Sequence, residues 1–179
     1  MQQTLQVKDK LFRISITETQ IHEQIKRVAA EINRDYAGQE PVFLAVLNGA
    51  FIFAADLLRE VTLPCEISFV KLASYEGTSS TGTVHEVIGL NIDLTGRPVI
   101  IVEDIVESGL TLKHMMETLK NQRPASIAIC TLLQKPEKLQ VKLDVKYCAI
   151  QIPNDFIVGY GLDYDGYGRN TKDIYTIVE

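Results

Sequence analysis

The side chains best suited to bind a phosphorylated ligand lie together between residues 103 and 111. Two neighbouring carboxylates, Glu103 and Asp104, are followed by a third at Glu107. The next turn, Ser108-Gly109-Leu110-Thr111, offers two hydroxyl groups and a glycine backbone. At the N-terminus of a helix, such a turn can present amides and hydroxyls to a phosphate, and the helix dipole favours the negative charge. The segment therefore predicts a phosphate-binding loop beside acidic groups.

The elements around this segment are of the kind that would place it at the edge of a sheet. Val99 to Val102 form an uninterrupted β-branched run, which is typical of a parallel strand covered on both faces. A loop over residues 105–108 and a helix opening at 109–111 are expected to follow. Open α/β sheets bind ligands at the carboxyl ends of their strands. The alternative is a solvated strand end before an ordinary helix, but the order of the parts favours a site.

The remaining periodicity predicts an α/β fold with a mostly parallel sheet flanked by helices, in a single domain over residues 1–179. A helix is expected from Thr17, because Thr17 and Gln20 match a capping box and apolar residues follow at helical spacing. Further strands are expected over residues 11–16, 42–47, 66–73, 87–92, 125–133, 146–151 and 156–160. The last two are expected to complete the sheet, joined by a turn at residues 153–155.

Composition and charge argue against several classes of function. The chain has 179 residues, of which 46% are apolar, and a net charge of −5 without a basic block, so binding to nucleic acid is not expected. No apolar run reaches the roughly 20 residues of a membrane helix, and the N-terminus lacks an apolar signal core. The three cysteines are widely spaced in apolar surroundings, as in a reduced cytoplasmic protein. A cytoplasmic location is therefore predicted.

Two other loops have compositions that suit a ligand site. Asn48-Gly49 joins a predicted strand to a predicted helix, and a glycine there would let the backbone approach an anion. The stretch from Ser74 to Thr83 is too polar to pack against a core, and a loop of this length is typical of an active-site lid or a disordered segment. A floppy hairpin without function is the alternative for this stretch.

The acid pair and the Ser-Gly-x-Thr turn after a core strand resemble the phosphoribosyl pyrophosphate (PRPP) motif of type I phosphoribosyltransferases. The tail from Phe156 to Tyr164, Phe-Ile-Val-Gly-Tyr-Gly-Leu-Asp-Tyr, resembles the corresponding segment of the 6-oxopurine members of that family. Together with Lys135, these matches extend over almost the whole chain after residue 40. The resemblance implies the type I fold, with a small hood from the N- and C-terminal parts and a flexible active-site loop over about residues 74–85.

The resemblance also implies a reaction. The 5-phosphoribosyl group of PRPP would be transferred to N9 of hypoxanthine, and of guanine, in purine salvage, giving IMP or GMP and pyrophosphate. Mg²⁺ is the implied cofactor, small molecules are the implied partners, and a homodimer or homotetramer is the implied assembly. Two alternatives stay open: a transferase that prefers xanthine, and a non-catalytic regulator that senses PRPP or a nucleotide.

The same resemblance implies a role for each matching position. Contacts to the ribose phosphate are implied for Glu103, Asp104, Ile105, Val106, Glu107, Ser108, Gly109, Leu110 and Thr111. Pyrophosphate contacts are implied for Asn48, Gly49 and Arg169, with a cis peptide bond at Leu47–Asn48. Purine contacts are implied for Lys135, Phe156, Ile157 and Asp163. Metal contacts are implied for Glu103, Asp104 and Asp163. Ser74 and Tyr75 would open the flexible loop.

Catalysis is implied for Glu107, Arg169 and Lys135, and the sequence departs from the family at two positions. Glu107 would accept the purine proton where most members of the family have aspartate. Glutamate adds one carbon–carbon bond, about 1.5 Å of reach. Asn48 stands where many members have lysine, which leaves pyrophosphate binding more dependent on backbone amides, Arg169 and metal.

Overall fold

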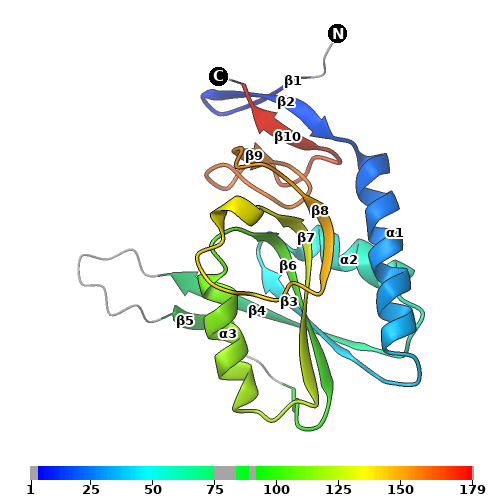
Figure 1. Ribbon diagram of the computed structural model, residues 1–179. Coiled ribbons are helices and arrows are strands. Elements are labelled where there is room, and N and C mark those ends of the chain that lie inside the picture. The colour runs from blue at the N-terminus through cyan, green and yellow to red at the C-terminus, as the bar shows by residue number, and fades with distance from the viewer. Residues whose placement is uncertain (1–3, 75–83, 89–91, 179) are drawn as a thin grey trace.

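The computed structural model describes residues 4–74, 84–88 and 92–178, and its largest element is a six-stranded sheet (Figure 1). The strands lie in the order β5-β4-β3-β6-β7-β8, and neighbouring strands are parallel except for β4 and β5. Their bounds are β3 Val42–Leu47, β4 Glu66–Ser74, β5 Val84–Ile88, β6 Pro98–Val106, β7 Ser126–Gln134 and β8 Tyr147–Gln151. The predicted α/β fold with a mostly parallel sheet is confirmed.

Helices cover both faces of this sheet. Their bounds are α1 Glu18–Asp35, α2 Phe51–Glu60 and α3 Leu110–Lys120, with a 3₁₀ turn η1 at Pro136–Lys138. Successive strand residues point to opposite faces, so Phe43 and Ile100 pack with α1 and α2, whereas Leu44 and Ile101 pack with α3. This double coverage explains the uninterrupted apolar runs of β3 and β6. No helix in the described part of the chain has both the length and the hydrophobicity of a membrane span.

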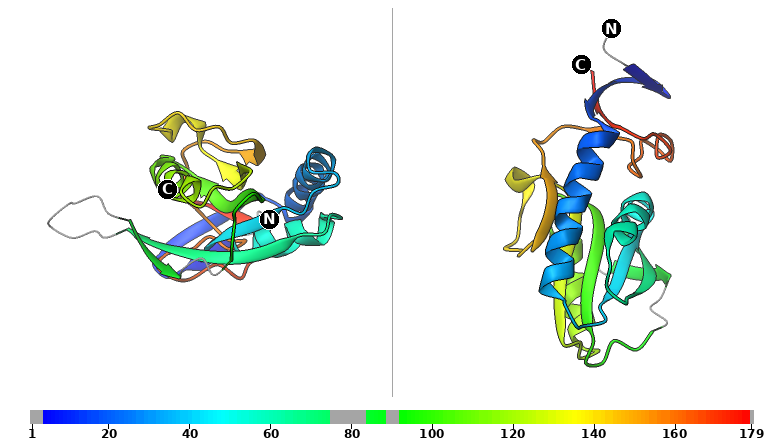
Figure 2. Two further views of the ribbon diagram at one scale, coloured as in Figure 1. Left: turned by 90° about the horizontal axis from the view of Figure 1, so that it is seen from below. Right: turned by 90° about the vertical axis from the view of Figure 1, so that its right-hand side faces the viewer.

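A second sheet, antiparallel and of order β1-β2-β10-β9, lies beyond one end of the large sheet and brings the two ends of the chain together (Figures 1 and 2). Its strands are β1 Thr4–Val7, β2 Lys10–Ile16, β9 Ile157–Val158 and β10 Ile174–Ile177. The prediction that residues 156–160 complete the large sheet is wrong, because Ile157 and Val158 pair with β10. β1 and β10 are two short strands that no local pattern predicts; β1 pairs with β2, and β10 pairs with β2 and β9.

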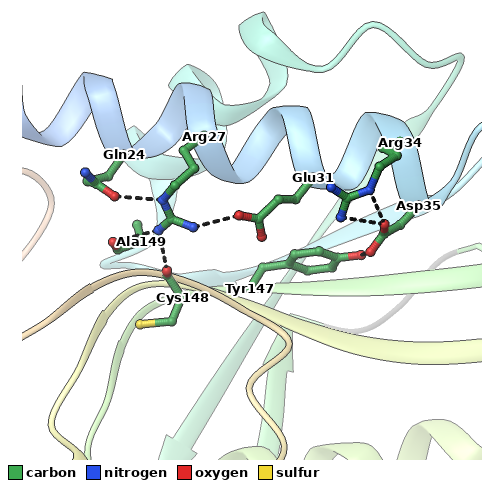
Figure 3. A network of polar contacts seen from close by, with 8 residues as sticks. All are labelled: Gln24, Arg27, Glu31, Arg34, Asp35, Tyr147, Cys148 and Ala149. Carbon is green, nitrogen blue, oxygen red and sulfur yellow. Dashed lines mark hydrogen bonds and ion pairs between the residues drawn. The ribbon is translucent and has the colours of Figure 1, made fainter.

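α1 begins as predicted and is fastened to the edge strand β8 by polar contacts (Figure 3). Thr17 and Gln20 form both hydrogen bonds of the capping box. In the middle of the helix, the Arg27 guanidinium donates to the main-chain oxygens of Cys148 and Ala149, at 2.8 and 3.1 Å. A charged side chain therefore joins the helix directly to the backbone of the strand.

The last turn of α1 carries the other half of this network (Figure 3). The hydroxyl of Tyr147, at the start of β8, donates to Asp35 Oδ2 at 2.8 Å. Arg34 and Lys146 lie 3.0 and 3.2 Å from the same carboxylate. The hydrogen bond from Tyr147, followed by those from the two cations, lowers the pKa of Asp35 to about 2. The carboxylate is thus held in its charged form by permanent protein partners.

Candidate active site

The predicted phosphate-binding loop lines a cavity of about 260 Å³ at the carboxyl end of β6. The cavity is lined by Glu103, Ile105, Val106, Glu107, Ser108, Gly109, Thr111 and Leu112. The strand itself is longer than predicted: Ile105 and Val106 belong to β6 and not to the loop, since they pair with Leu133 and Gln134 of β7. The loop therefore begins at Glu107, directly after the last paired residue.

Gly109 makes the turn between this strand and α3. Its φ of 78° lies in the left-handed region that favours glycine. An added Cβ would also lie 3.1 Å from a Val141 methyl group. Gly109 is the N-cap of α3 and has no side chain with which to occupy the amides of the first turn, and Thr111 of that turn lines the cavity. The Leu110 amide donates to Ser108 Oγ at 3.4 Å, so an anion in the cavity would compete with that hydroxyl for the amide.

The acid pair lies against the loop that follows β3. A Cβ added to Gly49 would lie 1.5 Å from Asp104 Oδ2, so the carboxylate occupies the space that any side chain there would need. The Leu47–Asn48 peptide bond in this loop is cis, which confirms that prediction. Burial, and then the charge of Asp104, raise the pKa of Glu103 well above its usual range, and burial raises that of Asp104. The buried surroundings of these two adjacent carboxyl groups therefore disfavour their charged forms unless a cation is present.

The C-terminal segment closes over the other side of this loop. Gly161 has a φ of 101°, and an added Cβ would lie 2.2 Å from the main-chain oxygen of Gly49. Arg169 donates to the main-chain oxygen of Gly161 at 2.7 Å and forms an ion pair with Asp163 at 2.6 Å. Asp163 also accepts from the Gly166 amide at 2.7 Å. The loop at 48–49, the acid pair and Arg169 therefore form one continuous group.

Lys135 lies directly after β7 and forms an ion pair with Glu107. This pairing follows from register, because Val106 and Gln134 are opposite each other at the ends of their strands, so the next residues meet. The second carboxylate oxygen of Glu107 lies 3.6 Å from Lys138 on η1, a residue that sequence reasoning missed although Pro136 marks the turn. Burial raises the pKa of Glu107, but the hydrogen bond from Lys135 and the two lysine charges outweigh burial and lower it overall.

Ile157 is the first residue of β9 in the small sheet, and Phe156 directly precedes it. The Phe156 side chain is 44% exposed, whereas Ile157 is buried in β9. The Phe156 ring meets Tyr164 edge-to-face at a centroid distance of 5.7 Å and lies tilted against Phe12 at 6.1 Å. An open aromatic face backed by two further rings is a surface on which a flat heterocycle can stack.

The three predicted metal ligands are not gathered into one cluster. Glu103, Asp104 and Asp163 do not form a metal cage, since the described residues contain no group of three or more His, Cys, Asp or Glu side chains able to hold an ion. Of the predicted flexible loop, Ser74 is the last residue of β4 and residues 84 and 85 begin β5. Tyr75 and the rest of residues 75–83 lie outside the described residues.

Comparison with known proteins identifies the class to which this fold and site belong. The family model of the phosphoribosyl transferase domain matches residues 16–165, so the chain belongs to that family. Among curated proteins, the hypoxanthine-guanine phosphoribosyltransferase of Mycobacterium avium is 41% identical over 171 residues, covering 92% of this chain and 84% of the relative.

Solved structures show the same relationship. A hypoxanthine-guanine phosphoribosyltransferase from Bacillus anthracis is 41% identical with a TM-score of 0.87, covering 93% of this chain and 96% of that one. The hypoxanthine phosphoribosyl transferase of Trypanosoma cruzi is 34% identical with a TM-score of 0.89, covering 97% and 95%. The similarity therefore extends over nearly the full length of both chains in each structural pair.

Proposed function

We propose that this protein transfers the 5-phosphoribosyl group of PRPP to N9 of hypoxanthine or guanine, in purine salvage, releasing pyrophosphate. One observation carries the proposal. A cavity lined by the start of a helix and by Glu107, Ser108, Gly109 and Thr111 lies at the end of β6, and the buried Lys135 is paired with that glutamate. Relatives named for this reaction match the chain over 92% of its length.

The ribose 5-phosphate would bind in the loop over residues 107–111. Its oxygens would accept hydrogen bonds from the hydroxyls of Ser108 and Thr111 and from the amides around Gly109 and Leu110. Ile105 and Val106 would form part of the wall of the phosphate-binding cavity. Glu103 and Asp104, at the inner end of the cavity and the adjoining loop, would accept hydrogen bonds from the ribose hydroxyls.

Pyrophosphate would lie between the loop at 48–49 and Arg169. Asn48 and Gly49 would offer backbone amides, and Arg169 would exchange its ion pair with Asp163 for the phosphate oxygens. The carboxylates fit Mg²⁺, because the acid pair has raised pKa values that a cation would reverse and Mg²⁺ commonly takes most of its ligands from phosphates and water. Glu103, Asp104 and Asp163 would hold the ion, which would offset the charge of the leaving pyrophosphate.

The purine would stack on the open face of Phe156, with its edge toward the main chain of Ile157. Lys135 would donate to the 6-oxygen. A lysine has donors but no acceptor, so it favours a 6-oxo group and opposes the 6-amino group of adenine. Because Lys135 is paired with Glu107, the purine must replace this ion pair with hydrogen bonds of its own to the two side chains.

Glu107 would accept the proton released from the purine imidazole. A group with a lowered pKa is ionised at neutral pH, which is the form that a base requires. Departure of pyrophosphate builds positive charge on the ribose, as in glycoside cleavage. The carboxylates around the sugar would stabilise that charge, and Arg169 the charge of the leaving group.

The direct test is pyrophosphate release from PRPP and Mg²⁺ with hypoxanthine, guanine, xanthine or adenine in parallel. We expect turnover with hypoxanthine and guanine and little with adenine. Preference for xanthine would replace the assigned substrate, and binding of PRPP without turnover would make the protein a sensor. A crystal soaked with IMP should place the phosphate on residues 107–111; a phosphate elsewhere would contradict the assigned seat.

A cytoplasmic location and a homodimeric or homotetrameric assembly are part of the same proposal. The support for both is membership of the family. Light scattering during size exclusion would measure the mass in solution, and a monomer would contradict the expected assembly.

A further inference from the structure

Tyr160 joins the C-terminal segment to α2 through a buried side chain that the proposed reaction does not use. It lies between Gly159 and Gly161, and all three residues have positive φ angles, of 105°, 50° and 101°. Tyr160 is 3% exposed. Its hydroxyl forms a hydrogen bond with Asp56 Oδ2, in the middle of α2. A tyrosine is thus held in a backbone conformation that L side chains rarely adopt, with its hydroxyl directed at a carboxylate.

The two residues joined by this bond belong to elements that form the two sides of the proposed pyrophosphate site. α2 starts at Phe51, directly after the loop at 48–50. The residue after Tyr160 is Gly161, which packs on the main-chain oxygen of Gly49 and accepts from Arg169 at 2.7 Å. The Gly161 amide in turn donates to the main-chain oxygen of Arg169 at 2.9 Å. A shift of Tyr160 would therefore move Gly161 and Arg169 together relative to Gly49.

The Asp56 carboxylate has further polar neighbours besides the Tyr160 hydroxyl. His22 Nε2 on α1 lies 3.5 Å from Asp56 Oδ2, and Arg59 lies 3.2 Å from Oδ1. The rings of His22 and Tyr160 meet edge-on at 6.4 Å. Burial, and then the hydrogen bond to Asp56, raise the pKa of the Tyr160 hydroxyl, which therefore remains a donor. The bond is charge-assisted and largely sheltered from water, conditions that make a hydrogen bond strong.

We propose that Tyr160 is a positioning residue for pyrophosphate: its hydroxyl bond to Asp56 fixes Gly161 and Arg169 against the loop at Asn48-Gly49. This inference rests on the proposed function, because it assumes that the loop and Arg169 bind the pyrophosphate end of PRPP. Loss of the bond would leave the fold in place but would let the two sides of the site separate, and a displacement of about 1 Å is enough to weaken a positioned contact.

The chain contains a matched control for this claim. Tyr147, 1% exposed, makes the same kind of bond to Asp35, but it does so between the edge strand β8 and the last turn of α1, two strands away from β6 (Figures 1 and 3). Tyr147→Phe and Tyr160→Phe each remove one hydroxyl from a buried tyrosine bonded to an aspartate. Comparable losses of thermal stability are expected in both variants. Only Tyr160→Phe should affect the pyrophosphate site.

The experiment measures steady-state kinetics with PRPP and hypoxanthine, and calorimetric binding of magnesium pyrophosphate, for the wild type and both variants. For Tyr160→Phe we expect KM for PRPP and Kd for magnesium pyrophosphate to rise about tenfold, because a small displacement of Gly161 and Arg169 weakens their positioned contacts to the ligand. KM for hypoxanthine should remain near the wild-type value. Tyr147→Phe should leave all three constants unchanged.

Substitutions at Asp56 test the same hydrogen bond by changing its acceptor. Asp56→Asn keeps an acceptor oxygen and should preserve most of the PRPP affinity, whereas Asp56→Ala should behave as Tyr160→Phe does. The double variant Tyr160→Phe with Asp56→Ala should be no weaker than either single variant, because both remove one interaction. These variants keep the test usable if one substitution prevents folding.

Two sets of results would overturn the inference. One is a KM for PRPP that changes no more in Tyr160→Phe than in Tyr147→Phe, and the other is an equal loss for PRPP and hypoxanthine. The proposed function fails separately, if the wild type shows no turnover with any purine. Binding of magnesium pyrophosphate would then still decide the role of Tyr160, and a wild type that does not bind it would refute both.

Discussion

The polar network between α1 and β8 and the polar groups around the β6 cavity differ in what satisfies them. Arg27, Asp35 and Tyr147 bond to protein groups that remain in place whatever the protein binds (Figure 3). In the candidate site, Lys135 is paired with Glu107 and Arg169 with Asp163, so groups proposed to bind ligand neutralise each other instead. Charged side chains therefore stabilise the fold where their partners are permanent and serve binding where partners can be exchanged.

The strongest way to break this comparison is Glu107→Gln. Glutamine keeps an oxygen that can accept from Lys135, so the fold should persist, but it cannot take a proton. Loss of a general base lowers kcat by about 10²–10⁴-fold. The measurement is the pH–rate profile beside that of Glu137→Gln, an exposed carboxylate on η1. An unchanged rate and profile in Glu107→Gln would remove this residue from the mechanism.

Lys135→Ala tests the other half of the exchangeable pair. A lost charged hydrogen bond to the 6-oxygen should raise KM for hypoxanthine by about 10–100-fold, with little change in KM for PRPP. Glu107 is partly exposed and remains near Lys138, so its charge stays solvated. Lys138→Ala serves as the control and should have a smaller effect. If Lys135→Ala weakens every substrate equally, the lysine has a structural role only.

In the network between α1 and β8, Arg27→Met should lower the free energy of unfolding and leave kcat unchanged. The methionine retains an apolar stem but leaves two main-chain oxygens of β8 without their donor, which we expect to cost about 1–2 kcal/mol. Urea unfolding measures this loss, with Lys26→Met as a variant that removes an exposed charge from the same helix. A changed kcat in Arg27→Met would contradict the separation of the two networks.

The smallest expected effect is a pH dependence of stability at Asp35. Its pKa is about 2 in the folded chain against a reference value of 3.8. The unfolded state therefore takes up the proton first, so the stabilisation is present above pH 3.8 and is lost as pH falls toward 2. Asp35→Asn should flatten the acid limb of urea-unfolding curves, and Tyr147→Phe should flatten it in part. An unaltered limb in Asp35→Asn would show that these contacts do not persist in solution.

Local patterns predict much of the large sheet and little of the contacts between its strands. The capping box of Thr17 and Gln20 and the turn at Gly109 follow from neighbouring residues, so they could be predicted. The pairing of Lys135 with Glu107 depends on the register of β6 and β7, which no short stretch of sequence specifies. The same limit applies to β9, whose two residues are a strand only because β10 pairs with them.

The site residues show the same division. The segment from Glu103 to Thr111 is recognisable because strand, acids and helix start are adjacent in sequence. Tyr160 and Asp56 are 104 residues apart, and nothing near either one indicates the other. Such pairings arise from tertiary packing, which sequence patterns do not encode locally.

Arg27 also affects whether a second molecule of this protein can pair with β8. β8 ends the large sheet, and an open strand of this kind can accept a strand from another molecule. Successive carbonyls of a strand face opposite sides, so one of the two oxygens bound by Arg27 faces outward. The guanidinium donates to that oxygen and places a positive charge at the edge of the sheet. We therefore expect this arginine to disfavour pairing of a second molecule's strand with β8.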